Sequence, residues 1–479
     1  MAEQLIIAGE RRDAIDGDLF TVTEPATGKP LTEVAKASAK DVDLALGLAT
    51  KAFDDGRGAW ARTSATLRGR VLHKVAELLR EREDLFATTE ARGAGHPIGD
   101  ARWEVGAAAG TFEYYAGAAN KHFGQVIPVQ DAGLDVVLRE PVGPVGLIVP
   151  WNFPLLIACW KLAPALACGN PVILKPASLT PLTALLLGDV LVDAGIPADQ
   201  VYVLPGPGGI IGDALVADHR TAKISFTGET TTGASILKSS ADHIARVSLE
   251  LGGKSAALVF ADADIAKAAA DAPMSVFGNA GQDCCARSRI LVERPAYDEF
   301  VERFAAATQA VKLGDPLATE TEMGPMISVG QRQTALDYLE IGTGEGARVV
   351  TGGEVPDGDG FYLSPAVVAD VDNSMRIARE EIFGPVATVI PFDTEDDAIR
   401  ISNDSDYGMS GSLWTGSATR AIRVAKSLRT GTISVNSSRS VRFEAPFGGY
   451  KKSGLGRELG MGAMDAYTEV KNVHFSEED

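Results

Sequence analysis

Apolar and polar positions follow two kinds of pattern along the chain, and each pattern predicts its own elements. Short strands and turns are predicted within residues 1–36, and apolar residues recur at helical spacing between about residues 40 and 120. From about residue 144 to residue 250, short apolar runs alternate with helical segments, and a second series of this kind runs from residue 256 to about residue 445. Strands that alternate with helices predict parallel, doubly wound sheets, which bind ligands outside the carboxyl ends of their strands.

Single elements are predicted from the same patterns. In the second series, Pro273 separates two predicted helices, at residues 265–271 and 274–277, because a proline inside a helix removes a hydrogen bond. Residues 134–139 and 466–475 alternate like strands, and we expect them to form a small sheet that reaches another subunit. The first series predicts helical segments, notably residues 181–194, between five strands at residues 145–149, 171–175, 201–204, 223–226 and 246–250.

Composition and charge exclude several classes of protein. The 479 residues include 45 Lys and Arg against 64 Asp and Glu, a formal net charge of −19 that repels nucleic acid and anionic lipid. No apolar stretch reaches the roughly 18 uninterrupted residues of a transmembrane helix. The N-terminus lacks the basic and apolar regions of a signal peptide. We therefore expect a cytoplasmic protein that has neither nucleic acid nor membrane as a partner.

The cysteine and histidine content argues against metal and disulfide chemistry. The chain has four cysteines and six histidines, without a CxxC pair, an HExxH motif or a mixed cluster of the two residue types. We therefore predict no metal centre, and a disulfide framework is disfavoured.

Four features are candidates for chemistry, and each also has a plainer interpretation. The glycine-containing segment 228–233 follows a predicted strand and either faces an anion or forms an ordinary turn; it lacks the lysine of a P-loop, which argues against nucleotide hydrolysis. Cys284 lies in a polar stretch, unlike most inert buried cysteines. Glu250 ends a strand and either pairs with Lys254 or acts as a general base. Asn152 follows another strand, as a turn former or as an oxyanion donor.

Five segments together resemble the aldehyde dehydrogenase superfamily, in the order and spacing of its motifs and across essentially the whole chain. They are PWNFP at residues 150–154, LELGGK at 249–254, GQDC at 281–284, EIFGP at 381–385 and PFGGYKKSG at 446–454. The resemblance implies an α/β, aldehyde dehydrogenase-like fold with a doubly wound parallel-sheet cofactor domain, a second α/β catalytic domain and a small β oligomerisation element. The implied boundaries are 1–122 and 142–252 for the NAD(P)-binding domain, 253–447 for the catalytic domain, and 123–141 with 448–479 for the oligomerisation or bridging element.

The resemblance also implies a mechanism, the oxidation of an aldehyde to the carboxylic acid with NAD(P)+. Cys284, the cysteine of the GQxC motif, would attack the aldehyde, and the Asn152 amide and the Cys284 backbone N–H would hold the oxyanion. After hydride transfer leaves a thioester, Glu250 would activate the water that hydrolyses it.

Several alternatives stay open beside this mechanism. Cys285 is a second possible nucleophile, one residue later than the motif places it. Asp283 would disfavour the Cys284 thiolate by like-charge repulsion unless its carboxylate points away. A CoA-acylating semialdehyde dehydrogenase generally lacks the glutamate of LELGGK, and a non-catalytic structural homologue would have lost Cys284, Glu250 or Asn152. All three residues are present.

Cofactor residues carry over from the family's motifs. Lys175 resembles the lysine that binds the adenosine ribose, Glu381 the carboxylate that holds the nicotinamide ribose, and Phe383 the aromatic residue beside the nicotinamide. Ser178 stands where many NAD-preferring members have a glutamate that repels a 2′-phosphate, so NAD is expected first and NADP is admissible. Glu229 stands where many members have a serine, so its charge must point away from the phosphates or weaken their binding. The implied cofactor set is Ile148, Val149, Pro150, Trp151, Lys175, Ser178, Gly208, Gly228, Glu229, Gly233, Leu251, Gly252, Glu381 and Phe383.

The substrate tunnel is the least defined part of the resemblance. Its aromatic residues favour an apolar substrate body, whereas Asp283 and Glu444 would attract a cationic tail, as in aminoaldehydes. Arg287, Arg289 or Arg442 would instead clamp the carboxylate of a semialdehyde. The expected assembly is a homodimer or homotetramer that acts on a small-molecule aldehyde. The implied tunnel residues are Phe153, Trp160, Asp283, Cys285 and Phe447.

Overall fold

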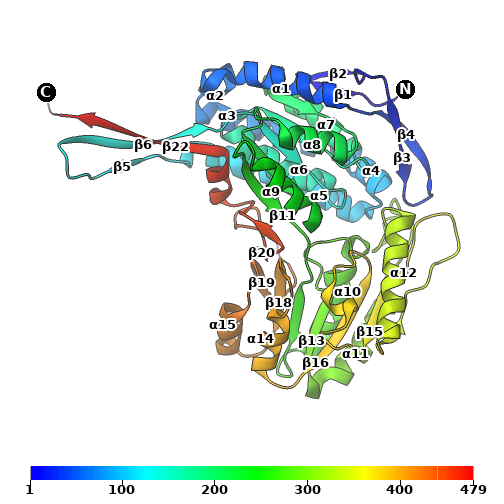
Figure 1. The fold of residues 1–479 in the computed structure, drawn as a ribbon. Coiled ribbons are helices and arrows are strands. Elements are labelled where there is room, and N and C mark those ends of the chain that lie inside the picture. The colour runs from blue at the N-terminus through cyan, green and yellow to red at the C-terminus, as the bar shows by residue number, and fades with distance from the viewer. Residues whose placement is uncertain (1, 440, 478–479) are drawn as a thin grey trace.

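The computed structural model describes residues 2–439 and 441–477, which form two lobes and a projecting tail (Figure 1). Within the sheet of the first lobe, five neighbouring strands are parallel, and β1, β2 and β21 pair antiparallel to their neighbours. The doubly wound parallel sheet expected for the first series is therefore confirmed. The strands lie in the order β2 (Glu10–Arg12), β1 (Leu5–Ile7), β9 (Val201–Val203), β8 (Val172–Lys175), β7 (Val145–Ile148), β10 (Lys223–Thr227), β11 (Arg246–Glu250) and β21 (Gly454–Leu455).

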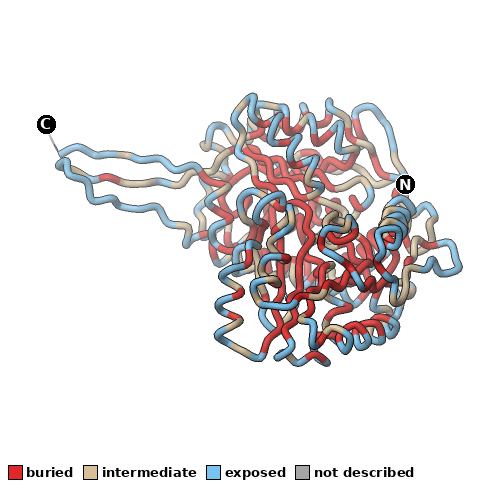
Figure 2. The backbone as a smooth tube through the Cα atoms, turned by 60° about the horizontal axis from the view of Figure 1, so that its bottom comes forward, coloured by how far each residue is buried: buried red, intermediate tan, exposed pale blue. Residues whose placement is uncertain are grey.

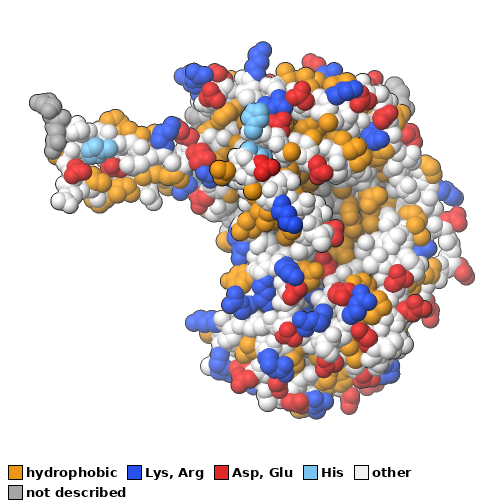
Figure 3. All heavy atoms as spheres, viewed as in Figure 1, with side chains coloured by type: hydrophobic (Ala, Val, Ile, Leu, Met, Phe, Trp, Pro, Cys, Tyr) orange, Lys and Arg blue, Asp and Glu red, His pale blue; other side chains and the backbone are white. Residues whose placement is uncertain are grey.

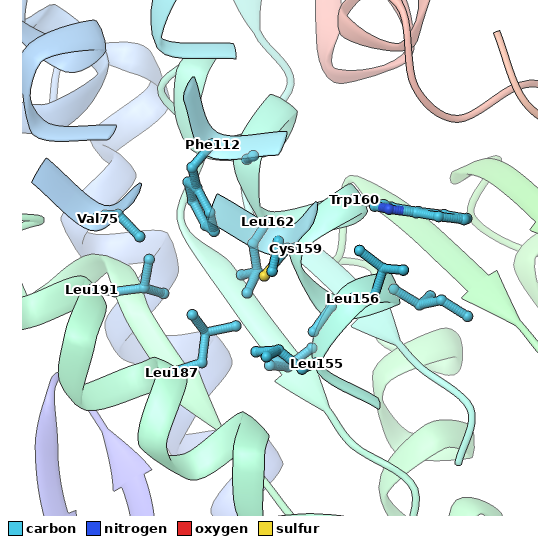
Figure 4. Packing of buried hydrophobic residues seen from close by; sticks show 14 of the residues in the cluster. Val75, Phe112, Leu155, Leu156, Cys159, Trp160, Leu162, Leu187 and Leu191 are labelled. Atoms are coloured by element: carbon cyan, nitrogen blue, oxygen red, sulfur yellow. The ribbon is translucent and has the colours of Figure 1, made fainter. Parts of the chain in front are cut away.

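Helices cover both faces of this sheet. The helix α6 (Pro154–Ala167) is buried along its whole length, and Figure 4 shows its Leu155 and Cys159 in the core beside Phe112 and Leu187. Strands that are covered on both faces must be apolar throughout, which is why β7, β8 and β9 are buried at every position. One face packs on α6 with α3 (Ala65–Glu81), α4 (Glu83–Ala94), α5 (Ile98–Ala118) and α7 (Leu182–Asp193), and the other on α1 (Ala39–Phe53) and α8 (Asp213–Ala217).

The second lobe confirms the second α/β series. It has its own apolar core, and Figure 2 shows buried backbone in the interior of the molecule. All strand pairs of its sheet are parallel except β14 with β15. The strands lie in the order β14 (Arg348–Thr351), β15 (Ala366–Ala369), β16 (Val386–Phe392), β13 (Arg289–Glu293), β12 (Ala256–Val259), β18 (Ser410–Trp414) and β19 (Thr432–Val435). The helices are α10 (Ile265–Phe277), α11 (Arg294–Gln309), α12 (Val329–Gly344), α14 (Glu395–Asn403) and α15 (Ala418–Ser427).

The tail is a three-stranded antiparallel sheet that projects from the first lobe (Figure 1). Its central strand β6 (Gly133–Pro141) pairs with β5 (Gln125–Ile127) and with β22 (Thr468–Ser476). The predicted pairing of these two distant segments is confirmed, although β22 begins later than expected because residues 461–467 form a 3₁₀ helix. Hydrophobic side chains line part of the tail surface in Figure 3. Those exposed on or beside the sheet include Phe123, Val126, Leu134, Val470 and Phe475.

One prediction about the second lobe is wrong. Residues 265–277 form a single helix, α10, with Pro273 inside it. The helix continues past the proline because Ala272, Val276 and Phe277 are buried in the core of the lobe. Their packing outweighs the hydrogen bond that the proline cannot donate.

Short elements complete the fold. A hairpin near the N-terminus confirms the strands predicted there. Among the described residues, no helix is long and apolar enough to cross a membrane. The short elements are the hairpin strands β3 (Leu19–Glu24) and β4 (Lys29–Ala35), α2 (Ala59–Arg62), α13 (Arg376–Arg379), β17 (Tyr407–Gly408) and β20 (Tyr450–Lys451).

Candidate active site

Three predicted site residues follow the carboxyl ends of strands in the first sheet. The parallel strands lie in the spatial order β9, β8, β7, β10, β11, so the direction of winding reverses between β7 and β10. Asn152 follows β7, Gly228 follows β10 and Glu250 ends β11. Doubly wound sheets bind ligands at this edge, so the three residues lie where the fold places a ligand crevice.

Cys284 lies on a tight turn between α10 and β13. Asn279 and Gly281, before it, have left-handed φ angles of 50° and 72°. Gly281 is also required by space, because a Cβ there would lie 2.2 Å from the carbonyl oxygen of Gly384. The turn leaves Cys284 half-buried and Cys285 buried, and both thiols are free. The structure therefore presents one of the two candidate thiols to the crevice.

The side chain of Asn152 is bonded to the same turn. Its Nδ2 donates to the carbonyl oxygen of Gln282 at 3.0 Å, and the backbone carbonyl oxygen of Asn152 accepts a hydrogen bond from Asn279 Nδ2 at 2.7 Å. Asn152 is only 4 % exposed. One bond thus fixes the side-chain amide and the other fixes the backbone of Asn152, so the amide is a preorganised donor for an oxyanion beside the nucleophile turn.

Glu250 is a buried carboxyl group without a cationic hydrogen-bond partner among the described residues. Its Oε2 makes no hydrogen bond there, and a Cβ at Gly448 would lie 2.5 Å from its Oε1. Burial, and then the charge of Glu458, raise the pKa of Glu250 well above its usual range, although Lys161 opposes them. The alternative pairing with Lys254 is wrong, because Lys254 Nζ has no hydrogen-bond partner among the described residues.

The sequence patterns did not identify two charged residues that lie near Glu250. Lys161 of α6 donates to the carboxylate of Glu458 and to Ser225 Oγ, the latter at 3.1 Å. Lys161 is fully buried in a helix that is otherwise apolar, and this lone charge was a usable signal. Glu458 offered none, because its partner is 297 residues away.

The environment of Cys284 favours the neutral thiol. A hydrogen bond with Cys285, burial and then Asp283 raise the pKa of Cys284 well above its usual range. Asp283 Oδ1 also accepts the Cys285 backbone N–H at 2.8 Å, so this carboxylate faces the turn. The expected like-charge effect of Asp283 is therefore present, and attack on a substrate requires a base to remove the thiol proton.

Glycines allow the segment after Glu250 to pass between two other parts of the site. A Cβ at Gly252 would lie 2.1 Å from Glu381 Oε2, and one at Gly253 would lie 2.2 Å from the Cys284 carbonyl oxygen. The Gly253 N–H donates to Glu381 Oε1 at 2.7 Å. Burial raises the pKa of Glu381 to about 7. The two glycines thus bring Glu381 next to the nucleophile turn.

Aromatic residues of the predicted cofactor set contact each other, and so do those of the predicted tunnel set. Trp151 and Phe383, both assigned to the cofactor, contact edge to face with ring centroids 5.2 Å apart. Phe383 has a φ of 57°, a strained value for a bulky residue. Trp160 and Phe447, both assigned to the tunnel, lie 5.1 Å apart. The rings of Phe153 and His96 also meet, with centroids 5.7 Å apart.

A groove in the first lobe collects part of the predicted cofactor set. It has a volume of about 410 Å³ and lies beside the first turns of α9 (Thr230–Ser240). A Cβ at Gly228 would lie 2.6 Å from the Phe226 ring, and one at Gly233 would lie 2.6 Å from Leu251. Backbone N–H groups at a helix N-terminus favour an anion. The lining includes Ile148, Gly208, Gly209, Phe226, Thr231 and Thr232.

The remaining cofactor candidates lie at strand ends beside this groove or on the neighbouring loops. Lys175 ends β8 and is buried, which lowers the pKa of its ammonium to about 8. Val149 N donates to the Lys175 carbonyl oxygen at 3.1 Å, and half-buried Pro150 follows. Ser178 Oγ donates to the carbonyl oxygen of Gly206 at 2.8 Å. Glu229 is exposed directly before α9.

Two of the three arginines considered as substrate clamps are not available. Arg287 and Arg289 are 1 % and 2 % exposed. Arg287 donates to the carbonyl oxygens of Cys285 and Ser438, and Arg289 donates to carbonyl oxygens that include that of Lys254. Sequence alone identified these guanidinium groups but not the direction in which they point.

The five motifs singled out in the sequence meet at this crevice. Asn152 of PWNFP bonds to Gln282 of GQDC, and Gly253 of LELGGK bonds to Glu381 of EIFGP. Leu251 N of LELGGK donates to the carbonyl oxygen of Ser453 in PFGGYKKSG at 2.8 Å. A family model described as "Aldehyde dehydrogenase family" matches residues 13–473. The chain belongs to the aldehyde dehydrogenase family.

Individual aldehyde dehydrogenases resemble the chain over nearly its full length. An aldehyde dehydrogenase of Aspergillus niger is 42% identical over 472 residues, covering 98% of this chain and 94% of that protein. Human retinal dehydrogenase 2 is 40% identical, covering 98% of this chain and 91% of that protein. The solved NAD+ complex of an aldehyde dehydrogenase from Bacillus cereus has a TM-score of 0.98 and 40% identity, covering 100% of this chain and 97% of that one. The expected fold is confirmed.

Proposed function

We propose that this chain oxidises an aldehyde to the carboxylic acid with NAD(P)+, through a covalent intermediate on Cys284. The observation that carries the proposal is the contact of Asn152 Nδ2 with Gln282, which brings an amide donor to the turn of a half-buried cysteine. Buried Glu250 supplies a carboxylate at the same crevice. A nucleophile, an oxyanion donor and a base are the three groups that this reaction needs from the protein.

The first half of the reaction forms the covalent adduct. The Cys284 thiol loses its proton to a base, and the sulfur bonds to the aldehyde carbon. The carbonyl oxygen becomes an oxyanion that accepts hydrogen bonds from Asn152 Nδ2 and the Cys284 backbone N–H. When bound, the nicotinamide supplies one chemical function, acceptance of the hydride that leaves this carbon. A thioester on Cys284 remains.

The second half of the reaction releases the acid. Glu250 takes a proton from a water molecule, whose oxygen adds to the thioester carbon, and the carbon–sulfur bond then breaks. Aldehyde, NAD(P)+ and water thus give carboxylic acid, NAD(P)H and a proton. Because Glu250 activates the water that hydrolyses the thioester, its presence argues against transfer of the acyl group to CoA. A non-catalytic homologue would not need the nucleophile Cys284, the oxyanion donor Asn152 or the base Glu250.

The pH dependence of turnover should reflect the raised pKa of Glu250. Its raised pKa means that turnover rises with pH as the carboxyl loses its proton. Replacing Lys161 with methionine removes a cation that favours the charged carboxylate of Glu250, so the rising limb should move to higher pH. Turnover measured across about pH 6 to pH 10 checks this, and an unchanged limb in a variant with wild-type Tm would contradict it.

The residues around the groove fit a dinucleotide. The N-terminus of α9 would offer backbone N–H groups to the pyrophosphate, and the missing side chains of Gly228 and Gly233 let Phe226 and Leu251 pack close by. Lys175 and Glu381 would hold the two riboses. Exposed Glu229 would point away from the phosphates. We propose NAD as the cofactor, because aldehyde dehydrogenases of this fold include NAD+ complexes, with NADP admissible.

Ser178 should decide how strictly NADP is rejected. Its hydroxyl bonds to Gly206 and carries no charge that repels a 2′-phosphate. We expect Ser178→Glu to raise the KM for NADP about tenfold or more and to change the KM for NAD less than about threefold. Initial rates against each cofactor measure both values. Equal changes in the two KM values would contradict this role.

The substrate is proposed to have an apolar body. Trp160 and Phe447 supply an aromatic wall, and Phe153 and Cys285 would extend it. Asp283 faces the turn and would favour a cationic tail, and exposed Glu444 is also available. Burial of Arg287 leaves exposed Arg442 as the remaining clamp for a carboxylate, so semialdehydes are less favoured.

One assay tests the reaction and ranks the substrates. Reduction of NAD and then NADP is followed with aliphatic, aromatic, amino-substituted and carboxylated aldehydes, with Cys284→Ala as the control. Reduction by the wild type alone would support the proposal. A folded wild type that reduces NAD or NADP only when CoA is added, and forms the acyl-CoA, would establish the acylating alternative.

The tail is proposed to make the protein a homodimer or homotetramer. Its exposed apolar residues, among them Val126, Val470 and Phe475, suit a protein partner better than solvent. The proposed domains keep the boundaries 1–122 with 142–252, 253–447, and 123–141 with 448–479. Four free cysteines suit a reducing compartment, and we place the enzyme in the cytoplasm. Light scattering after size-exclusion chromatography measures the number of subunits.

A further inference from the structure

A cluster of buried ionisable residues lies outside the site described so far. It consists of Glu90 on α4, His96 in the turn between α4 and α5, and Glu104 on α5, which are 2 %, 2 % and 1 % exposed. Charge-bearing atoms from all three lie within 4.8 Å of one another. His96 Nδ1 and Glu104 Oε1 are 2.6 Å apart. None of the three takes part in the proposed reaction.

The cluster contacts the segment that carries Asn152 at two points. Glu90 accepts a hydrogen bond from the backbone N–H of Leu155, in the first turn of α6, at 3.2 Å. The ring of His96 packs edge to face on Phe153, the residue after Asn152. Phe153 is the N-cap of α6 and makes no side-chain capping bond. Glu90 therefore caps α6 from another helix, where a negative charge also suits the helix dipole.

The same turn also contacts a segment that leads to the nucleophile. Ile98 N donates to the carbonyl oxygen of Pro316 at 2.7 Å, and a Cβ at Gly95 would lie 2.9 Å from the Pro325 ring. Two residues after Pro325, Ile327 N donates to Gln282 Oε1 at 2.9 Å. Gln282 is the residue whose carbonyl oxygen holds the Asn152 amide. The cluster thus lies behind both halves of the oxyanion site.

Stability alone does not account for the cluster. His96 Nε2 and Glu104 Oε2 are buried without a hydrogen-bond partner among the described residues. Unpartnered buried polar atoms cost free energy, and buried ionic groups often stabilise a fold no better than apolar side chains of similar size. What this cluster does supply is a fixed geometry at Leu155 and Phe153.

We propose that Glu90 and His96 are positioning residues, which hold the turn at Asn152 so that its amide meets the oxyanion formed on Cys284. This proposal rests on the proposed function, because it assigns a role in the same covalent step. Neither residue contacts the reacting atoms. Both act through α6 and Phe153.

The charge state of Glu90 makes this role dependent on pH. Glu90 faces Glu104 of α5, His96, Cys159 of α6 and the hydroxyl of Thr183 on α7, and the charge of Asp100 acts on Glu104 and His96 rather than on Glu90. Burial, and then Glu104, raise the pKa of Glu90 to about 7. Burial disfavours the charged form of His96, but the neighbouring carboxylates prevail and raise its pKa to about 9. Between these values a carboxylate caps α6, and at lower pH a weaker, neutral acceptor does so.

The test compares two reactions of Cys284, of which one forms an oxyanion. An activated aryl ester, 4-nitrophenyl acetate, acylates the thiol through a tetrahedral oxyanion and releases 4-nitrophenol without a dinucleotide. Iodoacetamide alkylates the thiolate by displacement of iodide and forms no oxyanion. We expect Glu90→Gln to slow acylation about tenfold at about pH 8 and to change alkylation less than about twofold. The acylation rates should converge towards about pH 6, where wild-type Glu90 is protonated.

Two further variants sharpen the test. Thr183→Val leaves Glu90 in place but removes a hydrogen bond that favours its ionised form. In this variant the acylation rate, which falls as Glu90 takes up its proton, should therefore begin to fall at a higher pH than in the wild type. Thr111→Val is the matched control, because Thr111 is buried in α5 and its hydroxyl donates to the carbonyl oxygen of Ala107, one turn earlier in the same helix. It should leave both rates of Cys284 within about twofold of wild type.

Each result decides the proposal. Slow acylation with normal alkylation in Glu90→Gln, together with the upward pH shift in Thr183→Val, would support it. Equal acylation by Glu90→Gln and wild type, or acylation and alkylation slowed by the same factor, would overturn it. A folded wild type that the ester does not acylate at Cys284 would overturn the proposed function as well, so the two failures are distinguishable.

Discussion

Replacing Cys284 with alanine is expected to lower aldehyde oxidation by about three orders of magnitude or more, because the covalent adduct cannot form. The fold should survive the change, since Cys284 is half-buried and its removal deletes one sulfur atom beside Cys285. Cofactor reduction at saturating aldehyde measures the loss. A Tm close to that of the wild type shows that the protein is folded.

The competing nucleophile, Cys285, is separated by a labelling experiment. Cys285 is buried whereas Cys284 is half-buried, so a reagent in solution should reach the thiol of Cys284 more readily. Iodoacetamide should label Cys284 in the wild type and in Cys285→Ala, and mass spectrometry of the peptides identifies the site. Labelling of Cys285 in the wild type, with oxidation retained by Cys284→Ala, would transfer the role of nucleophile to Cys285.

The sheets were predictable because each strand carries its own signal. Strands buried on both faces must be apolar at every position, as β7 and β8 are, and each is separated from the next by a helical segment. Pro273 shows where such local reasoning stops. A proline weakens a helix locally, but whether the helix continues depends on the tertiary packing of residues such as Val276 and Phe277.

The motif residues of the site were predictable for a related reason. Asn152, Gly228 and Glu250 follow strands of one parallel sheet, and topology alone brings such strand ends to one edge. The two glycines of LELGGK also indicate its close contacts, because only glycine leaves room for Glu381 on one side and Cys284 on the other. Backbone requirements of this kind can be read before the structure is known.

The supporting charges were not predictable in the same way. Lys161 is conspicuous in an apolar helix, but nothing near it in the chain names Glu458 as its partner. Glu90 and Glu104 lie on amphipathic helices where a carboxylate usually faces solvent. Their burial depends on how α4 and α5 pack against α6, which is a tertiary property. Residues that position a site through several elements therefore escape motif analysis even when the motifs themselves are clear.

Replacing Glu250 with glutamine is expected to separate the two halves of the reaction. Glutamine has nearly the same shape but cannot accept a proton from water, so hydrolysis of the thioester should slow about 100-fold. If Glu250 serves only this step, the adduct and the first hydride transfer still form. The enzyme then produces one equivalent of reduced cofactor rapidly and turns over slowly afterwards, with an acyl group on Cys284.

Rapid-mixing measurements of cofactor reduction, with mass spectrometry of the trapped protein, check this result. Glu444→Gln is the control, because Glu444 is an exposed carboxylate, and it should keep wild-type steady-state turnover with an apolar aldehyde. Loss of the rapid phase in Glu250→Gln would instead make Glu250 the base that first deprotonates Cys284. That outcome has a physical basis, since the pKa of the thiol is raised and the buried carboxyl of Glu250 lies at the same crevice. The size of the rapid phase therefore shows whether one carboxylate serves one proton transfer or two.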